Sequence, residues 1–106
     1  MHLVRTVFPR FREEHEGLPR KATGTSGEFY LDNGQFGGTD ALAYYCMIRH
    51  FRPRRIVEVG AGFSSRLAAL AGRRNGDTKL ICIEPHPDRA LRSGFPGLAG
   101  LIVEPV

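Results

Sequence analysis

The sequence predicts an α/β protein built on a parallel β-sheet, and three observations lead to this prediction. The short apolar runs RIVEV, KLICIE and GLIVEPV lack polar alternation, which indicates strands buried on both faces. Segments with apolar residues at helical spacing lie between these runs. The resulting order of helix, strand, helix, strand, helix, strand implies right-handed crossover connections between parallel strands.

Length and composition limit the chain to one small domain. It has 106 residues, of which 42% are hydrophobic and 25% charged, as is typical of globular proteins. No apolar run approaches the ~20 residues of a membrane-spanning helix. The first residues, MHLVRTVFPRFREEHEG, carry charges where a signal peptide needs an uninterrupted apolar stretch. A cytoplasmic location without membrane attachment is therefore expected.

Residues 1–26 are expected to form an irregular N-terminal arm, and residues 27–106 carry the predicted sheet. The arm is polar, of mixed charge and interrupted by proline and glycine, with a short helix expected only near RFREEHEG. The next segment, GEFYLDNGQFGGTD, combines aromatic residues with glycines and a strong Asn-Gly turn signal. It suits a lid over a ligand, or equally an ordinary loop pinned by its aromatic rings.

A helix is expected after this loop, capped by Thr39 or Asp40 and ended by Pro53. Its apolar face at helical spacing comprises Ala41, Tyr44, Tyr45 and Ile48.

Three strands and two helices complete the predicted fold. The strand Arg55–Val59 leads into a helix in FSSRLAALAGRR, and a turn at RNGD precedes the second strand, Lys79–Glu84. A short helix in PHPDRALRSG is expected to open at Pro87, because proline suits the first helical turn. The third strand is expected at Leu101–Val103.

Cysteine usage and charge argue against a disulfide, a metal site or a nucleic-acid interface. Cys46 and Cys82 lie in apolar surroundings, which indicates buried thiols, and the four histidines show no ligand spacing with them. The net charge is +4, but the basic residues are spread along the chain. The cluster RHFRPRR is better explained as a solvated helix end, which complements the helix dipole, than as a phosphate-binding patch. Nucleic acid is therefore ranked last among possible partners.

The stretch VEVGAGFSS places a carboxylate next to a glycine turn. A buried carboxylate is costly without a partner, so Glu58 needs a functional or structural reason. It lies at the C-terminal end of its strand, where ligands bind in open α/β sheets. Gly60 permits a tight turn, and Gly62 allows a ligand to approach the backbone. Ser64 and Ser65 open a helix whose free amides favour an anion.

Glu84, at the tip of the second strand, can accept both hydroxyls of a ribose, and with the glycine turn it predicts a nucleoside site. A dinucleotide fingerprint would require glycine where Ser65 stands and has no use for Glu58. S-adenosylmethionine has an ammonium, a carboxylate and a ribose, and no phosphate. In this interpretation Glu58 faces the ammonium, the helix amides take the carboxylate and Glu84 binds the ribose.

These residues resemble a known family. VEVGAGFSS followed by CIEPHP resembles motifs I and II of class I S-adenosylmethionine-dependent methyltransferases. The longer stretch FYLDNGQFGGTDALAYYCMIRHFRPRRIVEVGAGFSS resembles the methyltransferase-24-type branch. The resemblance begins near Phe29 and runs to the C-terminus. It implies a partial Rossmann-like, doubly wound parallel sheet, S-adenosylmethionine as cofactor, and methyl transfer to an acceptor, for which small molecules are favoured.

The resemblance also implies site residues. A lid over the methionine end of the cofactor would include Tyr30, Asn33 and Asp40. His86 would stack on the adenine, although a surface histidine at a helix entrance explains it as well. The two glycines could form only a tight turn, and Glu84 could be a solvated strand end. The residues implied for cofactor binding are Glu58, Gly60, Ala61, Gly62, Ser64, Ser65, Glu84, Pro85 and His86.

The family's sheet has about seven strands, of which this sequence supplies three. RIVEV would lie in the middle of the complete sheet, so that here it becomes an open apolar edge. We therefore expect a fragment of a longer protein, a homo-oligomer, or a separate polypeptide that pairs at this edge. Since the fourth strand carries groups near the transferred methyl, no catalytic residue is predicted. The alternative function is a truncated, non-catalytic Rossmann-like module that acts by self-association or partner binding.

Overall fold

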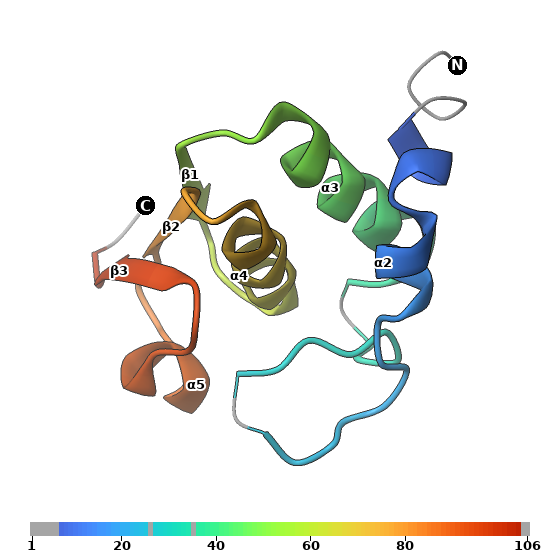
Figure 1. The fold of residues 1–106 in the computed structure, drawn as a ribbon. Coiled ribbons are helices and arrows are strands. Elements are labelled where there is room, and N and C mark those ends of the chain that lie inside the picture. Colours follow the sequence, from blue (N-terminus) through green and yellow to red (C-terminus); the bar gives the residue numbers. More distant parts are fainter. Residues whose placement is uncertain (1–6, 26, 35, 105–106) are drawn as a thin grey trace.

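The computed structural model describes residues 7–25, 27–34 and 36–104 and has an α/β architecture (Figure 1). Within these ranges the strands form one parallel sheet in the order β1-β2-β3, so the predicted combination of helices with parallel strands is present. Its elements are α2 (Arg12–Glu16), α3 (Gly38–Phe51), β1 (Arg55–Val59), α4 (Phe63–Asn75), β2 (Lys79–Ile83), α5 (Arg89–Ser93) and β3 (Leu98–Ile102).

The register of the sheet assigns neighbouring side chains to two opposite faces. Helix α4 packs on β2, and α3 packs on α4, so both long helices belong to the same face (Figure 1). The row that points toward these helices comprises Glu58, Cys82 and Leu101, and the adjacent row on the opposite face comprises Val57, Ile81 and Gly100.

The expectation that every strand is buried on both faces is wrong for β1. Its residues alternate between partly buried and exposed positions, and the side chains of Val57 and Val59 are 56% and 62% exposed. The physical reason is that, in the part of the chain that the structure describes, α3 and α4 cover only one face. An uninterrupted apolar run indicates an apolar environment on both faces, but it does not specify which segment provides it.

The core lies between α3, α4 and the covered face of the sheet. Tyr45, Leu67 and Leu80 are fully buried there. Cys46 and Cys82 are buried and free, which confirms the expectation of buried thiols. No helix within the described ranges is long and apolar enough to cross a membrane.

The N-terminal segment packs against α3. Its short helix, α2, is present near RFREEHEG as expected. Val7, Phe11 and Leu18 are buried members of the core, so this segment contributes apolar side chains that its polar composition did not suggest. Burial of these apolar side chains stabilises the position of the segment. Phe11 contacts Arg49 of α3, and Leu18 lies near Leu70 of α4. The part of the predicted arm before residue 7 lies outside the described residues.

Glu14 connects α2 to α3. One of its carboxylate oxygens accepts a hydrogen bond from Arg49 Nε at 2.7 Å and another from the Tyr45 hydroxyl at 2.5 Å. Arg74 of α4 lies 3.8 Å from the same oxygen. This partly buried carboxylate therefore joins α2 to α3 through charge-assisted hydrogen bonds and to α4 through an ion pair.

Two arginines of the RHFRPRR cluster have partners inside the protein. Arg49 donates to the side-chain oxygen of Asn75 at 2.5 Å as well as to Glu14, and Arg52 donates to the Asn75 carbonyl at 2.6 Å. The expected solvated helix end is therefore wrong for Arg49, whereas Arg52 is exposed as expected. Both side chains hold the C-terminal ends of α3 and α4 together.

Replacing Glu14 by glutamine is expected to remove a contribution to the unfolding free energy that requires the ionised carboxylate and is therefore lost at low pH. The hydrogen bond from Arg49 holds the pKa of Glu14 at about 2, below its ordinary value of 4.5. Because the folded-state pKa is depressed, the stabilisation is complete above pH ~4.5 and is lost as the pH falls toward ~2. At neutral pH we expect the variant to lose about 2 kcal/mol of unfolding free energy.

Urea unfolding between pH 2 and pH 7 measures this effect. Glu16→Gln is the matched control, because Glu16 is an exposed residue of the same short helix. We expect the control to keep the wild-type pH dependence. If Glu14→Gln and the wild type show the same slope of stability against pH, the role assigned to Glu14 is wrong.

The two helix starts differ from their predicted positions. Helix α3 begins at Gly38, and neither Thr39 nor Asp40 caps it, because both lie inside its first turn. Helix α5 begins at Arg89, where Asp88 accepts a hydrogen bond from a backbone amide of the first turn at 2.9 Å. The predicted opening at Pro87 is therefore wrong, since a side-chain cap at Asp88 decides the start.

Two strand ends also differ from the prediction. Strand β2 ends at Ile83, so Glu84 follows the strand instead of closing it. Strand β3 runs from Leu98 to Ile102, so it begins three residues before the expected start at Leu101. Ala99 and Gly100 have low strand propensity, so the sequence pattern does not indicate this earlier start. At these two small residues the pairing register of β2 with β3 shifts by one residue, because Leu80 pairs with Leu98 and Ile81 pairs with Gly100.

Candidate cofactor-binding site

The turn between β1 and α4 consists of Gly60, Ala61 and Gly62. Gly60 has a φ of +82°, a conformation that glycine adopts without steric cost. Its amide donates to the carbonyl of Ile83 at 2.9 Å, which fixes the turn to the end of β2. A methyl group placed on Gly60 would meet no atom within 4 Å. The turn therefore presents exposed backbone with open space beside it.

Glu58 lies on the covered face of β1 and is held by two hydroxyl groups. The Tyr44 hydroxyl of α3 donates to one carboxylate oxygen at 2.7 Å, and the Ser65 hydroxyl of α4 donates to the other. The amide of Gly62 donates to the same Ser65 oxygen at 3.2 Å. Glu58 thus has the partners that a partly buried carboxylate requires, and it links both long helices to the turn.

The Tyr44 hydroxyl is a hydrogen-bond donor and not a base. Burial, reinforced by the hydrogen bond to Glu58, holds the pKa of Tyr44 well above its usual value of 10.0. Burial also raises the pKa of the Cys82 thiol, which neighbours Glu58 across the sheet. Both groups remain protonated at neutral pH, so neither supplies a general base or an anionic nucleophile.

An open hollow with a volume of about 480 Å³ lies beside Glu58. Three predicted residues, Asp40, Glu58 and Ser64, come together there. Phe36 and Tyr44 are not among the predicted site residues; their rings pack edge to face with centroids 5.9 Å apart. Tyr44 was expected only in the apolar stripe of its helix. Its hydroxyl group was the one sequence signal that it could also donate a hydrogen bond at the site. The hollow is lined by Phe36, Asp40, Ala43, Tyr44, Glu58 and Ser64.

Glu84 contacts the glycine turn from the end of β2. One of its carboxylate oxygens accepts a hydrogen bond from the Ala61 amide at 2.8 Å, and the other accepts from the His86 amide at 3.2 Å. Glu84 does not line the hollow beside Glu58. Each oxygen nevertheless retains a lone pair for a further donor. Glu84 therefore holds the turn directly, and Glu58 is connected to it through the Ser65 hydroxyl. Only Glu58 lines the hollow.

The two residues after Glu84 differ in exposure. Pro85 is partly buried, and His86 is exposed. An exposed imidazole at this point agrees with stacking on a bound ring and equally with an ordinary surface histidine.

The loop before α3 is held in place by its own side chains. Asn33 donates to the carbonyls of Tyr30 and Phe36, each at 2.7 Å, and accepts from the Phe36 amide at 2.7 Å. The Tyr30 ring packs edge to face on Phe63 of α4, with centroids 5.0 Å apart. Of the three residues proposed for a lid, Asp40 lines the hollow, Asn33 organises the loop and Tyr30 packs against α4.

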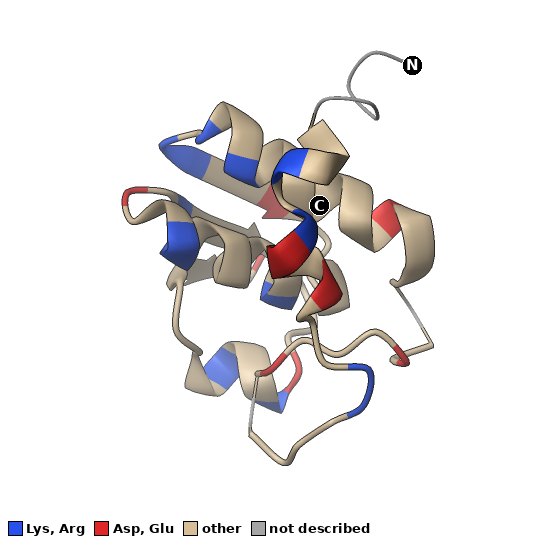
Figure 2. Ribbon diagram, turned by 45° about the vertical axis from the view of Figure 1, so that its right-hand side comes forward, with Lys and Arg blue, Asp and Glu red and all other residues tan. Residues whose placement is uncertain are grey.

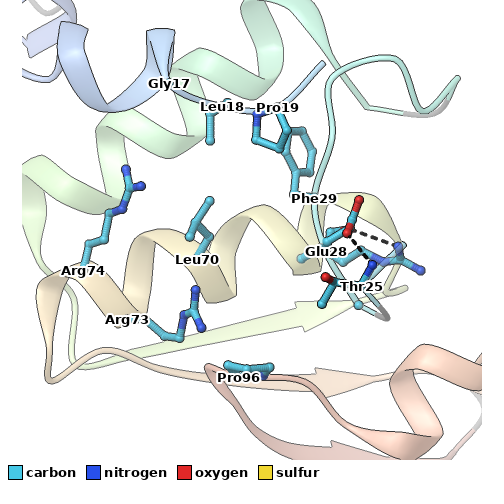
Figure 3. Close-up of a pocket in the computed structure, with 12 residues that line it drawn as sticks. Gly17, Leu18, Pro19, Thr25, Glu28, Phe29, Leu70, Arg73, Arg74 and Pro96 are labelled. Atoms are coloured by element: carbon cyan, nitrogen blue, oxygen red, sulfur yellow. Dashed lines mark hydrogen bonds between the residues drawn. The ribbon is translucent and has the colours of Figure 1, made fainter. Parts of the chain in front are cut away.

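A second cavity, of about 260 Å³, lies between residues 17–29 and the outer side of α4 (Figure 3). Leu18, Phe29 and Leu70 provide apolar walls, and Arg73 and Arg74 extend from α4 at one side. None of the residues predicted to bind the cofactor lines it. The cavity is therefore separate from the glycine turn.

The basic side chains are spread over several elements of the described chain. Figure 2 shows Lys and Arg in helices, in β1 and in the loop before α3, with Asp and Glu between them. Among the described residues, no group of three or more His, Cys, Asp or Glu is placed to hold a metal ion.

Comparison with known proteins finds an uncharacterized relative of this chain. No protein-family model and no solved structure matches the chain. An uncharacterized protein of Archaeoglobus fulgidus is 45% identical over an alignment of 82 positions, which covers 74% of this chain and 37% of that protein. The chain therefore spans well under half the length of this relative.

Proposed function

We propose that this chain is the cofactor-binding part of an S-adenosylmethionine-dependent methyltransferase with a class I, Rossmann-like fold. The observation that carries the proposal is an exposed glycine turn that Glu84 holds directly and that Glu58 holds through Ser65, at the C-terminal ends of neighbouring parallel strands. Ligands of open α/β sheets bind at this edge. The open space beside Gly60 gives a ligand room against the backbone.

The residues around the turn match the three polar parts of this cofactor. Glu84 keeps lone pairs for the two ribose hydroxyls while it holds Ala61. Glu58 offers a negative charge to an ammonium at the wall of the hollow. The first turn of α4, which includes Ser64, favours a carboxylate through its free amides and the helix dipole. When bound, the cofactor supplies a methyl group activated by its sulfonium.

The chain's own contribution to methyl transfer is binding and orientation. Holding the reactants in line lowers the barrier by removing translational and rotational freedom before the reaction. We assign no proton transfer to Tyr44, because its raised pKa keeps it protonated. The acceptor we propose is a small molecule, the class that the resemblance favours.

The second candidate function is a non-catalytic module that acts through a protein partner. The exposed face of β1 favours it, because Val57 and Val59 are apolar and face solvent. Binding of the cofactor without acceptor-dependent activity would distinguish this module from an enzyme.

Isothermal titration calorimetry tests the proposed ligand. We expect S-adenosylmethionine and its demethylated product to bind at one site per chain, and NAD and ATP not to bind. The reason is that Glu58 suits an ammonium and repels a phosphate. Binding of NAD or ATP in preference to S-adenosylmethionine, or no binding of any of them, would reject the proposal.

A further inference from the structure

The cavity between residues 17–29 and the outer side of α4 has the dimensions of a pocket for a small organic molecule (Figure 3). Its volume of about 260 Å³ lies just below the range of ~300–1,000 Å³ that is typical of such pockets. Leu18 and Phe29 form apolar walls on one side, and Leu70 of α4 faces them. Since Leu18 and Phe29 are buried members of the core, the cavity offers a fixed surface to an apolar group.

Hydrogen bonds hold the segment that forms the wall opposite α4. The carbonyls of Pro19 and Arg20 accept from the amides of Leu31 and Asp32, both at 2.8 Å. Farther along the segment, Arg66 of α4 donates to the carbonyl of residue 28 at 3.0 Å. The cavity is therefore formed before a ligand arrives, which lowers the entropic cost of binding.

Three arginines and one carboxylate line the cavity, so it is positively charged. Two of the arginines have partners in the protein: Arg66 donates to the main chain of Glu28, and Arg74 donates to the Tyr45 hydroxyl at 2.6 Å. Arg73 is exposed, and no residue in the described part of the chain forms a hydrogen bond or an ion pair with it. Its side chain extends from α4 beside the apolar walls (Figure 3).

The carboxylate of Glu28 does not neutralise Arg73. It accepts hydrogen bonds from the Thr23 hydroxyl at 2.7 Å, from the Thr25 amide at 2.8 Å and from the Thr23 amide. These bonds, above all the one from the Thr23 amide, hold the pKa of Glu28 below its usual value of 4.5. The negative charge of Glu28 is therefore compensated within its own loop.

An unpaired guanidinium beside apolar walls suits an anion with an apolar body. The planar guanidinium binds a carboxylate through two parallel hydrogen bonds. A single unpaired arginine balances one negative charge, whereas a phosphate monoester carries about two.

We propose that this cavity binds a small carboxylate with a compact apolar body, which lies against Leu18, Phe29 and Leu70 while its carboxylate pairs with Arg73. The proposal is independent of the proposed cofactor, because none of the residues assigned to that cofactor lines this cavity.

An NMR titration of the ¹⁵N-labelled chain with 3-phenylpropanoate tests the proposal. We expect a dissociation constant of about 1 mM or lower, as is ordinary for a ligand of this size. The largest shift changes should fall on the amides of residues 17–29 and 70–74, and not on those of Gly60–Gly62. The uncharged 3-phenylpropanamide has the same shape and should bind at least about tenfold more weakly, because it cannot form the charge-assisted pair.

Substitution of Arg73 tests the position of the carboxylate. Arg73→Gln should weaken binding of 3-phenylpropanoate at least about tenfold, and Arg73→Lys should have an intermediate effect, because lysine keeps the charge and loses the paired donors. Arg54→Gln is the matched control, since Arg54 is an exposed arginine that does not line the cavity, and it should bind as the wild type does. The NMR spectrum of each variant shows whether it is folded.

Four results would overturn the proposal. They are a dissociation constant of the wild type above the expected value, equal affinity for 3-phenylpropanoate and its amide, unchanged affinity in folded Arg73→Gln, and tighter binding of phenyl phosphate. The last result would assign the cavity to a phosphate instead of a carboxylate.

Discussion

Replacement of Glu84 by alanine is expected to weaken binding of S-adenosylmethionine by about 100-fold, because it would remove the two charge-assisted hydrogen bonds that we propose to the ribose. The carboxylate at this position already holds the Ala61 amide at 2.8 Å, so its location beside the turn is fixed before a ligand arrives. Calorimetric dissociation constants of the wild type and the variant measure the effect. Glu84→Gln should bind with intermediate affinity, because it retains one acceptor oxygen and loses the charge.

Glu104→Ala is the matched control for this experiment. Glu104 is an exposed acid two residues after the end of β3, and its removal changes the net charge by the same amount. Thermal unfolding of each variant separates a damaged turn from a lost ligand contact. If Glu84→Ala remains folded and binds as tightly as the wild type, the assignment of Glu84 to the ribose is wrong.

Replacement of Gly97 by alanine is expected to lower the free energy of unfolding by at least ~3 kcal/mol. If the unfolding free energy of the wild type is smaller than this loss, the variant does not fold. Gly97 lies between α5 and β3 with a φ of +94°, which an L-residue adopts only with strain. A methyl group there would lie 2.5 Å from the backbone oxygen of Ala69 and 2.9 Å from its Cβ. Since Ala69 is a buried residue of α4, neither the helix nor the strand can move aside locally.

Gly76→Ala provides the control for backbone strain alone. Gly76 has the same φ of +94°, but a methyl group there would meet no atom within 4 Å. We expect this variant to lose only about 1 kcal/mol. Urea unfolding of both variants gives the difference. Similar losses of unfolding free energy for the two variants would show that the close approach of Gly97 to Ala69 of α4 does not contribute to the effect of Gly97→Ala.

The sequence predicts the elements whose local signals agree with their environment. The β-branched run RIVEV and the apolar spacing of FSSRLAALAGRR are consistent with β1 and α4. The beginning of β3 is not predictable in this way, because Gly100 carries no strand signal and is held there by pairing with β2. The uncovered face of the sheet cannot be predicted from the sequence either. The exposure of Val57 depends on which segments pack against it and not on its neighbours in the sequence.

The candidate site shows the same division between local and tertiary information. The glycine turn and its two acids follow from their order along the chain. The partners of Glu58 do not, because Tyr44 belongs to another helix and looks like a core residue from its spacing. Local patterns locate the backbone of the site, whereas the hydrogen bonds that orient it arise only when α3 packs on α4.

The sequential order of β1, β2 and β3 has a consequence for biosynthesis. Each strand pairs with the strand that follows it along the chain, but the pairing is parallel, so a crossover connection separates the two partners, as between Arg55 and Lys79. Parallel pairing of this kind is slow to form, because the crossover must close before the two strands meet. During synthesis the first pair can therefore form only after α4 and β2 have left the ribosome, and the three-stranded sheet only after β3.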